Sequence, residues 1–156
     1  MRRIIYKLLN ISGRLTSAYH VLKWKILGAE IGRNPVIYGS PEVIGNLRNL
    51  KVGDNFSVNH GVHINCRGKV LIGNNVTLSS KSQLHTGKLL FKQEPKLHVD
   101  APIILEDNVW IASGVIVSAG VRIGRNSVIG ANSVVTKDVE SGCFYAGNPA
   151  KKIKEL

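Results

Sequence analysis

Branched aliphatic residues recur at every sixth position through the C-terminal half of the chain: Leu105, Ile111, Val117, Ile123, Ile129 and Val135. Small side chains follow four residues after each of them: Val109, Val115, Val121, Ser127, Ser133 and Val139. A period of six does not fit an α-helix, whose apolar face returns at three and four residues, nor a simple alternating strand. It is typical of short strands joined by tight turns, three to a triangular coil, with coils stacked about 4.8 Å apart. The pattern therefore predicts an all-β fold, a parallel β-helix with the aliphatic ladder inside.

The same spacing is present, less regularly, in the first half of the chain. It shifts by two residues near Gly68-Lys69, and its members are Val52, Val58, Ile64, Ile72, Leu78 and Leu84. The ladder then stops until about Ile103, so residues 86–101 are predicted to form a loop expelled from the coil, and such long loops are usually functional. We expect a β-helix domain over residues 29–156, with about five coils in a prism roughly 25 Å tall. Residues 140–156 are expected to form a C-terminal tail.

The first 28 residues follow a different period. Apolar side chains recur at steps of three and four, which predicts an amphipathic helix with a basic opposite face: Ile4, Leu8, Ile11, Leu15, Ala18, Leu22 and Ile26. Ser12-Gly13 leaves open a break into two helices. The helix has two interpretations: it caps the open end of the prism and hides unpaired strand edges, or it rests on an anionic lipid surface.

Charge narrows the choice of partners. The formal net charge is +11, and six basic residues precede the first acid, Glu30. Such a surface suits nucleic acid, anionic lipid or a phosphorylated small molecule, but no nucleic-acid-binding motif is present. Cys66 and Cys143 lack metal-site spacing, so we interpret them as small core residues in a reducing compartment. With no apolar run typical of a signal peptide or a membrane span, we expect a cytoplasmic protein that can sit at the inner face of a membrane.

Four motifs carry a family resemblance: D-N-V-W-I at 107–111, A-G-V-R-I-G at 119–124, V-I-G-A-N-S-V-V-T-K-D-V at 128–139 and A-G-N-P-A-K at 146–151. In them the chain resembles the hexapeptide-repeat acyltransferases, in the branch of the maltose, galactoside and xenobiotic acetyltransferases and many polysaccharide O-acetyltransferases. The resemblance implies a left-handed β-helix and a homotrimer with active sites in the grooves between prisms. It also implies acetyl-coenzyme A as acyl donor, with no metal. The expected acceptor is a hydroxyl, less readily an amine, of a sugar in a cell-surface polysaccharide or lipid-linked glycan precursor.

Acyl transfer needs a base near neutral pKa, and histidine is the usual one. In the family, a histidine at the start of the extruded loop serves as this base. His85 stands at this junction, but most relatives carry the histidine four residues later, where this chain has Leu89. His98, at the far end of the loop, is the second candidate because it could swing back into the same groove.

The resemblance also implies residues on the acceptor side of the site. Asn59 matches a position where relatives hold the acceptor by a side-chain amide, although a turn asparagine is an equal interpretation. Trp110 matches a tryptophan beside the site, and a partly buried strand residue at a groove is at least as good an interpretation. Ser113 matches the position whose backbone N–H faces the thioester oxygen.

Coenzyme A is expected along a prism face with small side chains, near Ala112, Ala131 and Thr136. Lys137 matches a family position near the coenzyme tail. Lys151 and Lys154, near the C-terminus, match positions where relatives carry basic residues close to the coenzyme phosphates. A lysine at such a position would act as a point charge. Simple solvation of the chain end is the alternative for these two.

Two other functions stay open. The γ-class carbonic anhydrases share the fold, and His63 and His85 match two of their three metal ligands, but the third position is Ser80, a poor zinc ligand. A scaffold or membrane-docking protein that has lost catalysis is the other, because Leu89 replaces the usual histidine. The chain has no G-x-x-x-x-G-K loop, so nucleotide hydrolysis is not supported.

Overall fold

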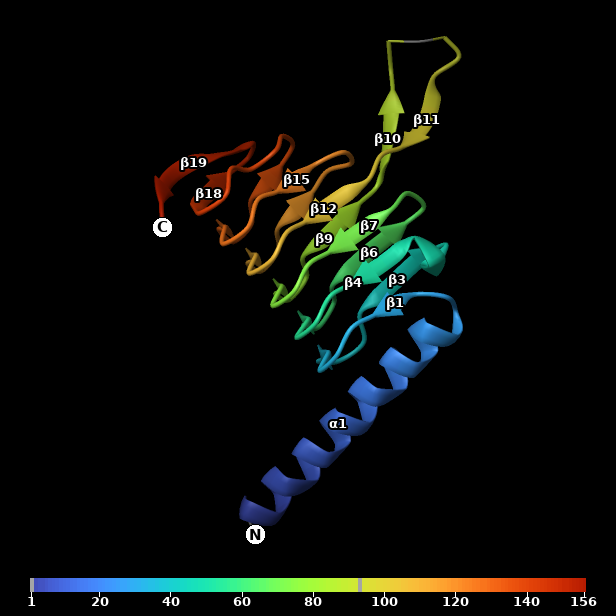
Figure 1. The fold of residues 1–156 in the computed structure, drawn as a ribbon, viewed down its shortest axis with the longest axis vertical. Coiled ribbons are helices and arrows are strands. Elements are labelled where there is room, and N and C mark those ends of the chain that lie inside the picture. The colour runs from blue at the N-terminus through green and yellow to red at the C-terminus, as the bar shows by residue number, and fades with distance from the viewer. Residues whose placement is uncertain (1, 93) are drawn as a thin grey trace.

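The computed structural model describes residues 2–92 and 94–156, with side chains from Gly13 onward, and shows a helix followed by a tapering stack of coils (Figure 1). Three strands make each of five complete coils. The first coil contains β1 (Glu30–Ile31), β2 (Val36–Ile37) and β3 (Glu42–Gly45). The second contains β4 (Leu50–Val52), β5 (Ser57–Val58) and β6 (His63–Cys66), after a short 3-10 helix, η1 (Leu47–Asn49). The third contains β7 (Val70–Ile72), β8 (Thr77–Leu78) and β9 (Gln83–His85).

Beyond the expelled loop the same arrangement continues. The fourth coil contains β12 (Ile103–Leu105), β13 (Trp110–Ile111) and β14 (Ile116–Val117). The fifth contains β15 (Arg122–Ile123), β16 (Val128–Ile129) and β17 (Val134–Val135). A partial sixth coil begins where Val139 bridges Ile123 and ends in β18 (Cys143–Gly147).

Equivalent strands of successive coils pair in parallel and form the three faces of the prism. The first face has the order β1-β4-β7-β12-β15, the second β19-β18-β16-β13-β8-β5-β2, and the third β17-β14-β9-β6-β3. Only β19, described below, is antiparallel to its neighbour on these faces. The predicted left-handed parallel β-helix is confirmed.

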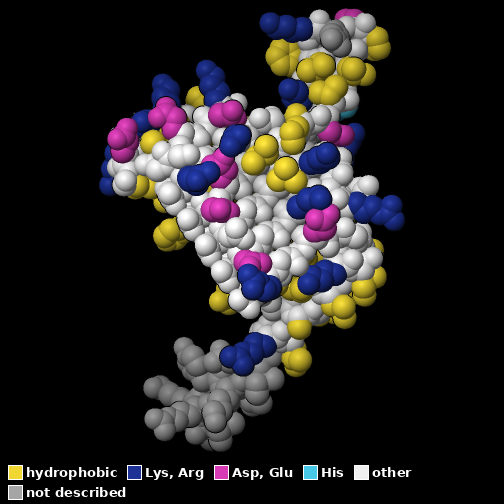
Figure 2. Space-filling view, viewed as in Figure 1, with side chains coloured by type: hydrophobic (Ala, Val, Ile, Leu, Met, Phe, Trp, Pro, Cys, Tyr) yellow, Lys and Arg dark blue, Asp and Glu magenta, His cyan; other side chains and the backbone are white. Residues whose placement is uncertain are grey.

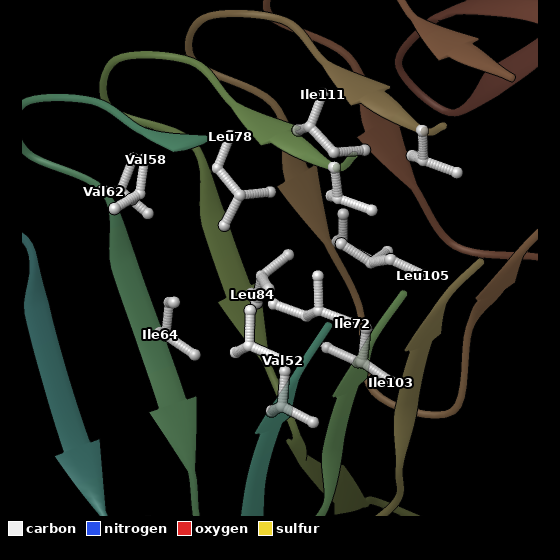
Figure 3. Packing of buried hydrophobic residues seen from close by; sticks show 14 of the residues in the cluster. Val52, Val58, Val62, Ile64, Ile72, Leu78, Leu84, Ile103, Leu105 and Ile111 are labelled. Atoms are coloured by element: carbon white, nitrogen blue, oxygen red, sulfur yellow. The ribbon is translucent and has the colours of Figure 1, made fainter. Parts of the chain in front are cut away.

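The predicted aliphatic ladder is the core. Its labelled members point into the interior of the prism (Figure 3). From Leu105 to Val135 the six-residue series is at most 1% exposed, and the small residues that follow at four are buried as well. Cys66 and Cys143 are buried core residues, as predicted, and burial raises the pKa of the Cys66 thiol to about 12.

One corner of the prism is built from asparagines. Asn34, Asn55, Asn75, Asn108 and Asn126 stand above one another with φ between 55° and 59°, in the left-handed region that asparagine tolerates better than most residues. Their side-chain amides form a continuous ladder of hydrogen bonds, 2.8–3.2 Å long. The polar turn residues of each hexapeptide therefore fix both the bend and the stacking of the coils.

The expelled loop is an ordered hairpin that projects from the prism (Figure 1). Strands β10 (Gly87–Leu90) and β11 (Leu97–Asp100) pair antiparallel, and the Ala101 N–H donates to the Thr86 carbonyl at 2.8 Å at its base. Thr86 is fully buried, so the projecting part begins at Gly87. Hydrophobic and basic side chains gather on the hairpin (Figure 2).

The N-terminal segment is one helix, α1 (Arg2–Ile26), so the break left open at Ser12-Gly13 does not occur. Trp24 is buried in the core, and the Ile37 N–H donates to Ser17 Oγ at 2.9 Å, so the last turns cover the first coil. The predicted apolar stripe is not the covering face, since Leu15 and Ile26 are 67% and 74% exposed. Within the described residues, no helix is both long and apolar enough to cross a membrane.

The expected C-terminal tail is a second hairpin. Strand β19 (Ala150–Glu155) pairs antiparallel with β18 along the edge of the second face. Lys152 Nζ lies 2.8 Å from Glu140 Oε2 and 3.1 Å from Glu155 Oε1, which clamps the hairpin to the preceding turn. These hydrogen bonds hold the pKa of Lys152 above its ordinary value.

Candidate functional site

His85 ends β9 on the third face, immediately before the hairpin. Its half-buried ring places Nε2 2.8 Å from Gln83 Oε1. Because an amide oxygen only accepts, we assign the proton to Nε2, which leaves the proton-accepting lone pair on Nδ1. The strand and Gln83 thus orient an imidazole in a tautomer suited to accept a proton.

A second histidine lies beside it. The rings of His63 and His85 are 5.2 Å apart, and His63 Nδ1 lies 3.0 Å from Glu42 Oε2, one coil below. Burial, and to a lesser extent the charge of His63, lowers the pKa of His85 below 6.5. His85 is therefore neutral at physiological pH. Sequence reasoning missed both partners. Glu42 is stacked on His63 by strand register across 21 positions, whereas Gln83 lies two residues before His85 on the same side of β9, a spacing that could have shown it.

His98 stands on the hairpin, away from His85 along the chain. It is exposed and lies directly opposite Leu89 in the β10–β11 ladder, so both side chains share one face of the hairpin. Leu89 is the position where relatives carry their histidine. His98 thus offers an imidazole beside that position, from the other strand.

The residues expected on the acceptor side gather at another corner, between the second and third faces. Trp110 Nε1–H donates to Ser79 Oγ at 3.0 Å, which fixes an indole that is otherwise 55% exposed. Asn59 stacks one coil from Ser79, and its amide donates to the Leu78 carbonyl at 3.4 Å. Ser113 lies beside Ala112 in the next coil, and no hydrogen bond from its backbone N–H is seen within the described residues.

Small side chains continue upward from this corner. Ala112 stacks on Ser79, and the next coil places Gly130 and Ala131 beside Ala112 and Ser113. This shallow strip is where an extended amide-rich chain such as pantetheine could approach the backbone.

The predicted site residues form two groups on one chain. His85 stacks in one column with Thr136, two coils away, beside exposed Lys137, at the far edge of the third face. Ser79 and His85 stand at the two ends of that face. A turn, closed by the hydrogen bond from the Ser82 N–H to the Ser79 carbonyl at 3.2 Å, and then β9 lie between them. The structure therefore brings together Asn59, Trp110 and Ser113, but it does not bring them to His85 within one prism.

Comparison with known proteins places this arrangement in a family. The family model of the bacterial transferase hexapeptide (six repeats) matches residues 102–137. A maltose O-acetyltransferase of Clostridium difficile is 32% identical with a TM-score of 0.80, over 85% of this chain and 72% of that one. The chain belongs to the hexapeptide-repeat acyltransferase family.

Other family members agree. A Vibrio cholerae hexapeptide-repeat acetyltransferase, solved with acetyl-coenzyme A, is 26% identical with a TM-score of 0.83, over 89% of this chain and 77% of that one. A Saccharomyces cerevisiae protein named provisionally as an acetyltransferase is 40% identical over 111 residues, which are 69% of this chain and 57% of that protein. The chain spans little more than half the length of the curated relatives it matches.

The two lysines expected near the coenzyme phosphates lie on β19. Lys151 and Lys154 are exposed there, at the edge of the second face, whereas their neighbour Lys152 is held by Glu140 and Glu155. Lys151 and Lys154 are therefore accessible to a ligand, whereas Lys152 makes a structural contact within the hairpin.

The structure gives little support to the metal-site alternative. His63 and His85 do lie side by side, but within the described residues no group of three His, Cys, Asp or Glu side chains could hold a metal ion. The third position expected of a carbonic anhydrase is Ser80, whose carbonyl accepts from the Gly114 N–H in the turn.

Proposed function

We propose that this hexapeptide-repeat protein transfers an acetyl group from acetyl-coenzyme A to a hydroxyl of a sugar. The observation that carries the proposal is the placement of His85: a half-buried imidazole at the base of the hairpin, held by Gln83 and with its pKa lowered by burial. A base of this kind typically contributes about 10²–10⁴-fold to the rate.

The chemistry assigns one task to each group. His85 takes the proton of the acceptor hydroxyl as its oxygen attacks the thioester carbonyl carbon. The Ser113 N–H donates to the carbonyl oxygen, on which negative charge develops. Collapse of the tetrahedral intermediate breaks the carbon–sulfur bond, and His85 returns its proton to the leaving thiolate. The products are the acetyl ester and free coenzyme A, so no further reactant is needed.

The donor and the acceptor meet at the corner between the second and third faces in this proposal. The pantetheine arm follows the strip formed by Ala112 and Ala131, with Thr136 and Lys137 near the coenzyme tail. Lys151 and Lys154 attract the coenzyme phosphates as exposed point charges. Asn59 holds the acceptor by its amide, next to the indole of Trp110. The acetyl-coenzyme A bound to the Vibrio cholerae relative supports this choice of donor.

The acceptor is proposed from the family and the N-terminal arm. A sugar hydroxyl is favoured over an amine because the maltose O-acetyltransferase is among the similar structures. A polysaccharide or lipid-linked glycan precursor fits a basic arm, residues 1–28, that brings a cytoplasmic homotrimer to the inner face of a membrane.

Calorimetry with acetyl-coenzyme A and free-thiol release with a panel of sugars test the proposal. We expect the His85→Ala variant to bind the coenzyme as the wild type does and to lose about 10²–10⁴-fold in transfer rate. His98→Ala tests the hairpin histidine in the same way, and His20→Ala, on α1, is the matched control that should retain transfer.

The variants and the coenzyme-binding measurement distinguish the alternatives. Loss of transfer only in His98→Ala moves the base to the hairpin. A wild-type protein that binds no acetyl-coenzyme A overturns the proposal and leaves a β-helix scaffold without catalysis.

A further inference from the structure

Helix α1 presents an apolar stripe to solvent. Leu15, Tyr19, Leu22 and Ile26 are 67%, 61%, 61% and 74% exposed. At 100° per residue these four positions lie within an arc of about 60° on one face of the helix. Trp24, which is buried against the first coil, lies on the opposite side. The stripe is therefore not hidden by the packing that holds the helix on the prism.

Basic side chains border the stripe on both sides. Arg14 and Lys25 lie along one edge and Lys23 along the other, all exposed. The chain has no acid before Glu30. An apolar stripe between two rows of cations is complementary to the boundary between phosphate headgroups and acyl chains.

A groove runs beside the stripe, between α1 and β2. Its volume is about 930 Å³, and its walls are mainly apolar, with Ala18, Val21 and Leu22 on the helix and Val36 and Tyr38 on the first coil. Arg14 and Lys25 also line it. An apolar cleft with cations in its lining suits a single acyl chain below an anionic headgroup.

We propose that α1 docks on an anionic phospholipid bilayer. The stripe enters the interface, Arg14, Lys23 and Lys25 contact headgroup phosphates, and the groove accepts an acyl chain of a bound lipid. A second copy of the chain is disfavoured as occupant because it would set two equally basic helices against each other. The surface deepens the membrane placement that the proposed function includes, and it needs neither coenzyme nor acceptor.

Co-sedimentation of the full chain with vesicles tests this surface. The vesicles contain phosphatidylcholine alone or with roughly one third phosphatidylglycerol, and no coenzyme or sugar. We expect binding only to the anionic vesicles. Leu15→Ser with Ile26→Ser, and separately Lys23→Glu with Lys25→Glu, should each weaken it about tenfold or more.

Two matched controls change the same chemistry elsewhere. Ile44→Ser with Leu156→Ser removes exposed apolar side chains from β3 and the C-terminus, and Lys69→Glu with Lys81→Glu reverses charge on the prism; both should bind as the wild type does. Equal binding by the stripe variant and the wild type overturns the proposal. So does a stripe variant whose molar mass falls in light scattering while its vesicle binding is unchanged, because the stripe then joins copies of the chain. Thiol release by the same variants with a soluble sugar reports separately on acetyl transfer.

Discussion

At the scale of single residues, His85 links the structure to a measurable pH dependence. Burial, and to a lesser extent the neighbouring His63, lowers its pKa below the ordinary value of 6.5. If His85 is the base, the acidic limb of kcat/KM has an apparent pKa below 6.5, and activity is lost only as the pH falls through that lower value. A pH–rate profile with acetyl-coenzyme A and an active sugar measures it.

The His63→Gln variant separates this explanation from a general effect of acid. It removes the His63 imidazole while leaving Gln83 on His85 and Glu42 in place, so the smaller of the two causes that lower the pKa of His85 is lost. The apparent pKa should rise and the acidic limb should move to higher pH. An acidic limb that moves to lower pH in this variant would contradict its assignment to His85.

At the scale of elements, the asparagine corner is expected to carry a measurable share of the stability. Asn75 has φ +56°, accepts from Asn55 at 2.8 Å and donates to Asn108 at 2.9 Å. Asn75→Ala should lower the free energy of unfolding by about 2 kcal/mol, since alanine neither tolerates the left-handed region nor completes the ladder. Urea denaturation followed by circular dichroism measures the difference.

Glycine at the same position provides the control. Asn75→Gly also removes both ladder hydrogen bonds but keeps the backbone conformation, so it should cost about 1 kcal/mol less than alanine. Equal losses in the two variants would place the whole effect in the side-chain ladder rather than in the backbone.

The same elements show what the sequence could predict. The six-residue period gave the coils and their buried residues, because each position of the repeat has one fixed direction in a β-helix. It could not give the face on which α1 packs. The stripe through Leu15 and Ile26 is the apolar face by period, yet the helix is held by Trp24 and Ser17 on the other side. Nor could it give the contact of His85 with His63, since stacking depends on where the register shifts, although the spacing of two residues does place Gln83 and His85 on the same side of one strand.

At the scale of the whole molecule, a single prism looks incomplete. Leu89, Phe91 and Leu97 are 41%, 69% and 50% exposed on the projecting hairpin, more apolar surface than such a small element needs in water. Asn59 and His85 lie at opposite edges of one face, too far apart to hold the same hydroxyl. Both features would be explained if the hairpin edge of one prism met the Asn59 corner of the next in a closed trimer.

Complementation between inactive variants tests this arrangement. Asn59→Ala and His85→Ala each remove one half of every site, but a trimer that contains both variants has one interface at which an intact Asn59 of one chain meets an intact His85 of another. Each mixed trimer therefore retains one intact site out of three, so the purified mixed trimers should recover about one third of the wild-type sites. Thiol release by the co-expressed pair, purified through two different tags, measures the recovery, with the separately expressed variants mixed after folding as the control. Recovery no greater than in that control would mean that each chain completes its own site, and the two halves would then have to meet by movement of the hairpin within one prism.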